Sequence, residues 1–140
     1  MQSGRSHTVG DQMSGPADSG LFIYAKDIPR VAPFYEFILG MTRRHTTSHL
    51  VVLSANGLQL VIHALEPENA GAAAVSGPPV PRDNAALKFF FTIPSLASAR
   101  GMAPSLGGMV LAHEYLGSGF RASNAVDPEG NIFHVRESAP

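Results

Sequence analysis

The sequence predicts an α+β fold made of two similar modules, and three observations lead to this prediction. Short apolar runs, several of them alternating with polar residues, indicate β-strands in both halves of the chain. One stretch in each half has the spacing of an amphipathic helix. Residues 66–86, dense in Ala, Gly and Pro and without any period, separate the halves as a linker. We therefore predict two strand–helix–three-strand (βαβββ) modules, residues 21–65 and 87–137.

The first module opens with an apolar strand, residues 21–25, which is followed by a helix. Asp27 is a candidate N-cap of this helix, and Gly40 is a candidate C-terminal end. The apolar residues of the helix recur at helical spacing, and they are Val31, Phe34, Tyr35 and Ile38. Pro33 removes a backbone donor inside the helix, so we expect a bend or a loose first turn there.

Three strands complete the first module, and the second module repeats the order. In the first module we expect strands at residues 42–47, 49–54 and 58–65, the last two joined by a hairpin at Asn56-Gly57. In the second module the predicted elements are a strand at 87–93, a helix opened by Pro94 and Ser95, and strands at 109–115, 120–126 and 131–137. The segment Asp127–Gly130 has the composition of a reverse turn before the last strand.

Composition excludes several classes of site and partner. The chain contains no cysteine, which rules out disulfides and thiolate metal sites. Its net charge of −1 is spread without a basic stripe, so we expect no nucleic-acid partner. No apolar run reaches the roughly 20 residues that span a bilayer, and no signal peptide is recognisable, so we expect a cytoplasmic protein without a membrane partner. Residues 1–20, rich in Ser, Gly, Gln and Asp, are expected to form a flexible N-terminal arm.

Strand parity indicates a second kind of face on the sheet. In each strand that can be read by alternation, one face is wholly apolar and the opposite face mixes apolar and polar side chains. The mixed faces carry Phe22, Tyr24, Gln59, His63, Lys88, Phe90, Ile132, His134 and Arg136. A half-apolar surface with a few polar groups is typical of a small-molecule pocket. A solvent-facing surface or an oligomer contact remains the alternative interpretation.

Two segments carry a family resemblance. They are the stretch Asp27–Met41, which contains Phe34-Tyr35 and Leu39-Gly40-Met41, and the ending Asp127–His134. Together with the repeated element order, they resemble the vicinal oxygen chelate superfamily, which includes glyoxalase I, bleomycin-resistance proteins, fosfomycin-resistance enzymes and extradiol dioxygenases. The resemblance covers residues 21–137, which we assign to one glyoxalase/bleomycin resistance-like domain. It implies that the two modules form a curved mixed sheet around a cleft, with the helices on the outer face.

In the metal enzymes of this family, the ligands come from the first and last strands of each module. By the resemblance, the four ligand positions fall on Gly20, Gln59, Lys88 and His134. Gly20 has no side-chain ligand atom, and the Lys88 ammonium would repel a divalent ion. His134 is a good ligand by type. We therefore expect no metal cofactor; a divalent ion, if one binds, would have Gln59, His63 and His134 as its ligands.

The family resemblance and the alternation of side chains along the strands together predict the site residues. His134 and His63 are the candidate catalytic residues, with an acid–base or a binding role. The candidate ligand-binding residues are Tyr24, Phe22, Gln59, Lys88, Phe90, Phe120 and Arg136. The aromatic members of this set suit stacking on an aromatic ligand. Lys88 could replace the charge of the metal, or it could form a salt bridge to Glu114 or Glu137.

Three functions are compatible with these residues. The first is metal-free binding of a small aromatic or anionic molecule, as in the drug-sequestering resistance proteins that the chain resembles. The alternative is an enzyme, a metal-dependent lyase, isomerase or dioxygenase that uses His63 and His134. The third is a non-catalytic accessory subunit whose mixed face is covered by another chain. Because the family often pairs modules across a dimer, we also expect a homodimer.

Overall fold

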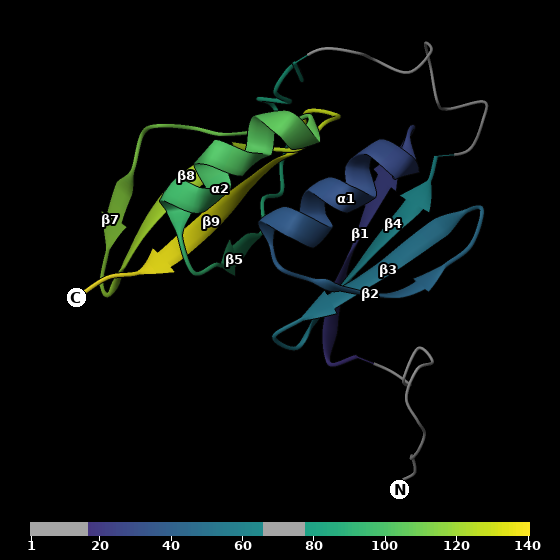
Figure 1. Ribbon diagram of the computed structural model, residues 1–140, viewed down its shortest axis with the longest axis horizontal. Helices are drawn as coiled ribbons and strands as arrows, with labels where there is room; N and C mark the ends of the chain where they lie inside the picture. Colours follow the sequence, from purple (N-terminus) through teal and green to yellow (C-terminus); the bar gives the residue numbers. More distant parts are fainter. Residues whose placement is uncertain (1–16, 66–77) are drawn as a thin grey trace, which may run out of the picture.

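The structure, a computed structural model, describes residues 17–65 and 78–140. It contains two mixed sheets, and helices lie in front of both of them in the view of Figure 1. Sheet A has the strand order β1-β4-β3-β2, and sheet B has the order β5-β9-β8-β6, with β7 paired to β8. This arrangement confirms the predicted α+β class and the division into two modules.

Module 1 forms sheet A and one helix, in the predicted order. Its elements are β1 (Ser19–Ala25), α1 (Ile28–Ile38), β2 (Thr42–Thr46), β3 (Leu50–Ala55) and β4 (Leu58–Ala64). β1 runs parallel to β4, while β2 and β4 are antiparallel to β3. The hairpin between β3 and β4 turns at Asn56 and Gly57, both with positive φ, which fits the Asn-Gly signal in the sequence.

Module 2 forms sheet B and contains more elements than the sequence predicts. They are β5 (Phe90–Thr92), α2 (Leu96–Met102), the 3-10 helix η2 (Ala103–Leu106), β6 (Met109–Val110), β7 (Tyr115–Gly117), β8 (Phe120–Val126) and β9 (Ile132–Ser138). β5 is parallel to β9, and the other pairs of sheet B are antiparallel.

Two strand predictions in module 2 are wrong in extent. The strand predicted at 87–93 is only three residues long, and Leu87 is 85% exposed. In the parallel register with β9, Leu87 would lie opposite Asn131, which precedes the first residue of β9. The strand predicted at 109–115 is divided into β6 and β7. Between β6 and β7, the carbonyls of Leu111 and His113 accept side-chain hydrogen bonds, from Arg100 Nε and from the Ser123 hydroxyl respectively.

The predicted arm and linker are only partly covered by the described residues. β1 begins at Ser19, so the predicted arm 1–20 is too long by two residues, and residues 1–16 lie outside the described part. Within the predicted linker, residues 66–77 also lie outside it. Residues 78–86 contain no helix or strand, as predicted. The Arg82 amide donates to the carbonyl of Gly130 and thereby attaches this part of the linker to the turn before β9.

The hydrophobic core crosses from one module to the other. Phe34 and Tyr35 of α1 pack against Phe133 of β9, with ring centroids 6.0 and 5.2 Å apart respectively. Phe89, just before β5, stacks on Phe133 at 5.1 Å. All the predicted apolar residues of the α1 stripe are buried. The helix of module 1 therefore completes the core of module 2.

A buried carboxylate joins the modules at the turn before β9. Asp127 is fully buried and accepts from the Tyr35 hydroxyl at 2.7 Å, from the amides of Glu129 and Asn131, and from the Asn131 side chain. Burial, followed by the charge of Asp127, raises the pKa of Tyr35 well above its usual range, so Tyr35 remains a donor. The sequence indicated a turn here but not this bond between the modules.

The start of α1 is capped by the other module. Asp27 is the N-cap of α1, as predicted, but its side chain makes no capping hydrogen bond. Instead, the Glu129 carboxylate accepts from the amides of Lys26 and Asp27 at 2.9 and 2.7 Å. A carboxylate at a helix N-terminus is favourable because the amides there lack intrahelical acceptors. Pro33 lies inside α1, as predicted.

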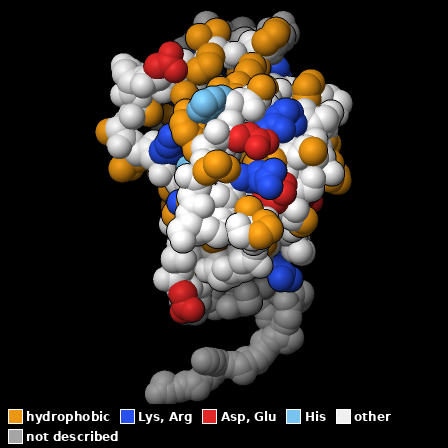
Figure 2. All heavy atoms as spheres, turned by 90° about the vertical axis from the view of Figure 1, so that its left-hand side faces the viewer, with side chains coloured by type: hydrophobic (Ala, Val, Ile, Leu, Met, Phe, Trp, Pro, Cys, Tyr) orange, Lys and Arg blue, Asp and Glu red, His pale blue; other side chains and the backbone are white. Residues whose placement is uncertain are grey.

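The surface at the module 2 end has no dominant charge. In Figure 2, Lys and Arg side chains alternate with Asp and Glu side chains and with hydrophobic ones on this face. The ion pair between Arg100 and Glu114 belongs to module 2. None of the helices in the described ranges is long and apolar enough to cross a membrane.

Candidate functional site

The predicted site residues occupy the mixed faces, which are the sheet faces opposite the helices. On sheet A the register pairs Tyr24 with His63, and their rings lie 5.7 Å apart. Phe22 stacks on Tyr24 at 6.3 Å, and both rings are more than half exposed, at 57% and 56%. Gln59 pairs with Gly20 further along the same strands. The residues Phe22, Tyr24, Gln59 and His63 are called the sheet A group.

The mixed face of sheet B carries a second group centred on Arg136. The Arg136 guanidinium lies between two rings, 3.8 Å from the Phe90 centroid and 4.0 Å from the Phe120 centroid. The register explains this packing, because Arg136 lies on β9 between β5, which holds Phe90, and β8, which holds Phe120. Both faces of the guanidinium are therefore covered by aromatic rings, and its edge is left for hydrogen bonds in the guanidinium plane.

His134 lies next to Arg136 on this face and has a defined tautomer. Arg136 Nε donates to His134 Nε2 at 3.3 Å, and an arginine cannot accept, so the proton of the neutral ring is on Nδ1. Burial, the charge of Arg136 and the charge of Lys88 lower the pKa of His134 below its ordinary value of 6.5. At neutral pH His134 is uncharged and offers an N–H donor, while its lone pair is occupied.

Lys88 lies on the other side of His134. Its Nζ donates to Asn124 Oδ1 at 3.1 Å, and Asn124 is the register partner of His134. The alternative salt bridges of Lys88 do not form, because Glu114 pairs with Arg100 and Glu137 accepts from the amide of Leu96. The ion pairs Arg43–Glu36 and Arg100–Glu114 of the described residues include neither Lys88 nor Arg136.

The structure thus brings the predicted residues together in two groups instead of one. In the described part of the chain, no ring contact or hydrogen bond joins the sheet A group to the sheet B group, which comprises Lys88, Phe90, Phe120, Asn124, His134 and Arg136. In the sheet A group, His63 Nδ1 lies 2.9 Å from the carbonyl of Ala64. Because a carbonyl can only accept, the proton of a neutral His63 ring lies on Nδ1, as in His134, but among the described residues no hydrogen bond engages His63 Nε2.

Sequence reasoning missed Asn124 and the aromatic sandwich around Arg136. Both follow from the pairing of β8 with β9, which places Asn124 opposite His134 and places Arg136 near Phe120. The parity of residues 120–126 contained this signal, because Phe120 and Asn124 share a face. The register of β8 with β9, which places Phe120 and Asn124 beside His134 and Arg136, could not be predicted from the sequence.

The residues at the family's ligand positions do not fit a metal ion. Gly20 and Gln59 lie on sheet A, His134 lies on sheet B, and Lys88 lies just before β5 with its side chain bonded to Asn124 of β8. Among the described residues, no three His, Asp or Glu side chains are grouped so as to hold a metal. His134 is flanked by the charges of Lys88 and Arg136, which would repel a divalent cation.

Comparisons with known proteins agree on the fold. No protein-family model and no curated protein matches the sequence. A glyoxalase/bleomycin resistance protein/dioxygenase family enzyme from Burkholderia phytofirmans PsJN is similar in structure, with a TM-score of 0.61 at 14% identity over 86% of this chain and 97% of that one. A glyoxalase-related enzyme from Fulvimarina pelagi has a TM-score of 0.62 at 17% identity over 86% of both chains.

A third similar structure is a mutant of the fosfomycin resistance protein FosX from Listeria monocytogenes, in complex with Mn(II) and 1S,2S-dihydroxypropylphosphonic acid. Its TM-score is 0.59 at 15% identity over 91% of this chain and 93% of that one. Identities this low concern the fold alone. Together with two modules of mixed sheet and helix, they show that the chain has the vicinal oxygen chelate fold of glyoxalase and bleomycin-resistance proteins.

Proposed function

We propose that this protein binds a small aromatic anion, such as an arene carboxylate or a phenolate, on the mixed face of sheet B without a metal ion. The observation that carries the proposal is the Arg136 guanidinium held between Phe90 and Phe120 with no carboxylate partner among the described residues. A cation in this setting is fixed in place and lacks a counter-ion of its own.

The charges around Arg136 favour an anion over a neutral ligand. Lys88 supplies a second cation, and His134 supplies a neutral N–H donor between the two. A carboxylate matches the in-plane edge of a guanidinium through paired, charge-assisted hydrogen bonds. The lone pair of His134 is engaged by Arg136, which supports a binding role over a general-base role for this residue.

The exposed rings favour an aromatic body on the ligand. Phe90 is 55% exposed beside the guanidinium, so a planar ligand can cover it while its anionic group reaches Arg136. The FosX structure holds Mn(II) together with a phosphonic acid, that is, a cation with an anion. In the present chain, Lys88 and Arg136 would supply the positive charge from the protein itself.

Calorimetric titration of the chelator-treated protein with benzoate and with benzamide tests the proposal. Benzamide has nearly the same shape but no charge, so benzoate should bind more tightly to the wild type. Arg136→Gln should weaken benzoate binding about tenfold or more, since a hydrogen bond to a charged group contributes about 1.5–3 kcal/mol. Lys88→Gln should weaken it by a smaller factor, because Lys88 is a more exposed point charge.

The matched control is Arg44→Gln, which removes an exposed arginine of β2 that is bonded to Ser54. Its benzoate affinity should stay within twofold of the wild type. Equal binding of benzoate and benzamide would contradict the proposal, as would full affinity in Arg136→Gln. Stoichiometric divalent metal that remains after chelation would contradict the metal-free part and would favour the enzyme alternative.

A further inference from the structure

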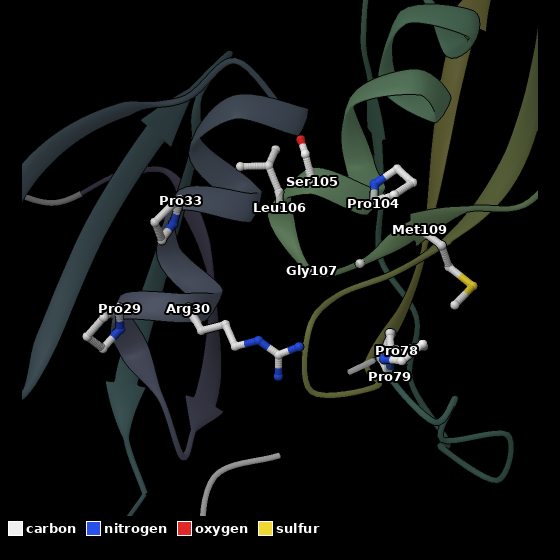
Figure 3. Close-up of a pocket in the computed structure, with 11 residues that line it drawn as sticks. Pro29, Arg30, Pro33, Pro78, Pro79, Pro104, Ser105, Leu106, Gly107 and Met109 are labelled. Carbon is white, nitrogen blue, oxygen red and sulfur yellow. The ribbon is translucent and has the colours of Figure 1, made fainter. Parts of the chain in front are cut away.

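A hollow of about 720 Å³ lies on the helix side of the molecule, away from both mixed faces. Its walls come from α1, from η2 and the glycines that follow it, and from the linker at Pro78 and Pro79 (Figure 3). None of the predicted site residues lines it. The volume falls within the range of about 300–1,000 Å³ that is usual for small-molecule sites.

Proline rings form much of this hollow. Pro29 and Pro33 are four residues apart on α1 and share one side of the helix, while Pro104 lines the hollow from η2. Pro33 inside a helix is costly, because it removes a backbone donor and disfavours the helix by about 3 kcal/mol relative to alanine. A residue that breaks a local rule in this way is expected where it serves a site.

One cation lines the hollow. Figure 3 shows the Arg30 side chain extending from α1 toward Gly107. The guanidinium passes close to Gly107, since a Cβ atom at that position would be in ordinary van der Waals contact with Arg30 Nε, 3.4 Å away. Arg30 Nη1 lies 3.4 Å from the carbonyl of Pro128. The hollow therefore combines apolar walls, including Leu106 and Met109, with a guanidinium at its edge.

We infer that this hollow is a second binding site, for an amphipathic monoanion with a flat apolar body and one sulfonate or carboxylate group. The proline rings and Leu106 would cover the apolar body, and Arg30 would hold the anionic group. The pyrrolidine ring of proline fixes the φ torsion, so these walls are preorganised and little conformational entropy is lost on binding. Because α1 belongs to module 1 and η2 to module 2, the ligand would contact both modules at once.

The fluorescent anion 1-anilinonaphthalene-8-sulfonate is a suitable probe of this site. The protein has no tryptophan, so the fluorescence background is low. Two variants of the full chain test the inference: Arg30→Gln removes the charge, and Ser105→Trp fills the hollow from an exposed position on η2. Each should weaken probe binding about tenfold or more, as judged from a fluorescence titration, since a charge-assisted hydrogen bond or the apolar volume is lost.

Two control variants separate this site from the mixed face of sheet B. Arg44→Gln removes an arginine outside both sites, and Arg136→Gln alters the proposed benzoate site; both should keep the probe affinity within twofold. Unchanged probe binding in Arg30→Gln and Ser105→Trp would overturn the inference. It would equally be overturned if Arg136→Gln caused the larger loss, because the probe would then bind on sheet B. Thermal unfolding of each variant, followed by circular dichroism, confirms that the fold is retained.

Discussion

Modules 1 and 2 share an order of strands and helix but place different chemistry on their mixed faces. Module 1 presents Phe22, Tyr24 and His63 in a chain of ring contacts. Module 2 presents a guanidinium between two rings, with Lys88 and a neutral His134 beside it. The order of strands and helix is repeated in the two modules, whereas the charged site is present in module 2 alone among the described residues. Anion binding should therefore depend on module 2.

The largest predicted effect concerns the joint between the modules, which is the buried hydrogen bond from Tyr35 of module 1 to Asp127 of module 2. Asp127→Ala should lower the free energy of unfolding by about 3–5 kcal/mol, because it leaves the buried Tyr35 hydroxyl and two partly buried amides without an acceptor. Urea unfolding measures the change. Tyr35→Phe, which removes one of these bonds, should cost about 1 kcal/mol. Asp83→Ala, at an exposed position, is the control. If Asp127→Ala lowers the free energy of unfolding as little as Asp83→Ala does, the hydrogen bonds to Asp127 do not stabilise the contact between the modules.

The second prediction compares the two helices. Pro33→Ala in α1 should raise the free energy of unfolding by about 1–3 kcal/mol, because alanine restores the backbone donor and favours the helix. Ser98→Ala in α2, a helix without an internal proline, should change it by no more than about 0.5 kcal/mol. Both values come from urea unfolding. If Pro33→Ala instead lowers the free energy of unfolding, the packing of the proline ring contributes more to stability than the restored backbone donor.

The third prediction concerns the pH dependence contributed by His134. Its pKa is lowered in the folded protein, so the unfolded chain binds the proton more readily. The stability that this residue contributes is complete above the ordinary value of 6.5, and it is lost as the pH falls through the lowered pKa. Between pH 7.5 and 5, the wild type should therefore lose more stability than His134→Gln. His63→Gln in module 1 is the control and should keep the His134 contribution.

An anion at Arg136 should reverse part of this shift. A bound benzoate would offset the positive charges that lower the pKa of His134, so the proton would be held more tightly in the complex. Benzoate affinity should consequently rise as the pH falls below about 6.5. A calorimetric titration at pH 7.5 and 5.5 measures this, and the rise should disappear in His134→Gln.

The smallest predicted effect tests the aromatic sandwich. A Cβ atom on Gly117 would collide with the ring of Phe120, so Gly117→Ala must displace that ring. One cation–π contact contributes about 0.5–1 kcal/mol, so benzoate affinity should fall about two- to fivefold. Ser118→Ala, in the adjacent turn, should leave it unchanged. If Gly117→Ala binds as tightly as the wild type, Phe120 does not support the site.

Much of this fold could be predicted from local patterns, whereas the joint between the modules could not. The α1 stripe and the Asn-Gly hairpin depend on residues close in sequence, and the structure confirms both. The shortened β5 lies against the start of β9, and side-chain hydrogen bonds from Arg100 and Ser123 reach the segment between β6 and β7. Neither contact has a local signal, because each joins residues that are brought together only by the tertiary structure.

The site shows the same division between local and distant information. Parity correctly placed His134 and Arg136 on one face of β9, because alternation along a strand needs no knowledge of its neighbours. The sandwich of Arg136 and the partner of Lys88 required the registers of β5 and β8. The hollow beside Arg30 was not predicted at all, since its walls come from three segments that are far apart in the sequence.

The Glu129 bonds to the amides of Lys26 and Asp27 also bear on how the chain is made. These two bonds join residues that are 103 and 102 positions apart in the sequence, and the Tyr35–Asp127 bond joins residues that are 92 positions apart. During translation, the first helix therefore reaches its native N-terminal bonds only after nearly the whole chain has been synthesised. Contacts with such long separation slow folding and leave early segments exposed. The hydrogen bonds at the start of α1 can therefore form only after the turn that contains Glu129 has been synthesised.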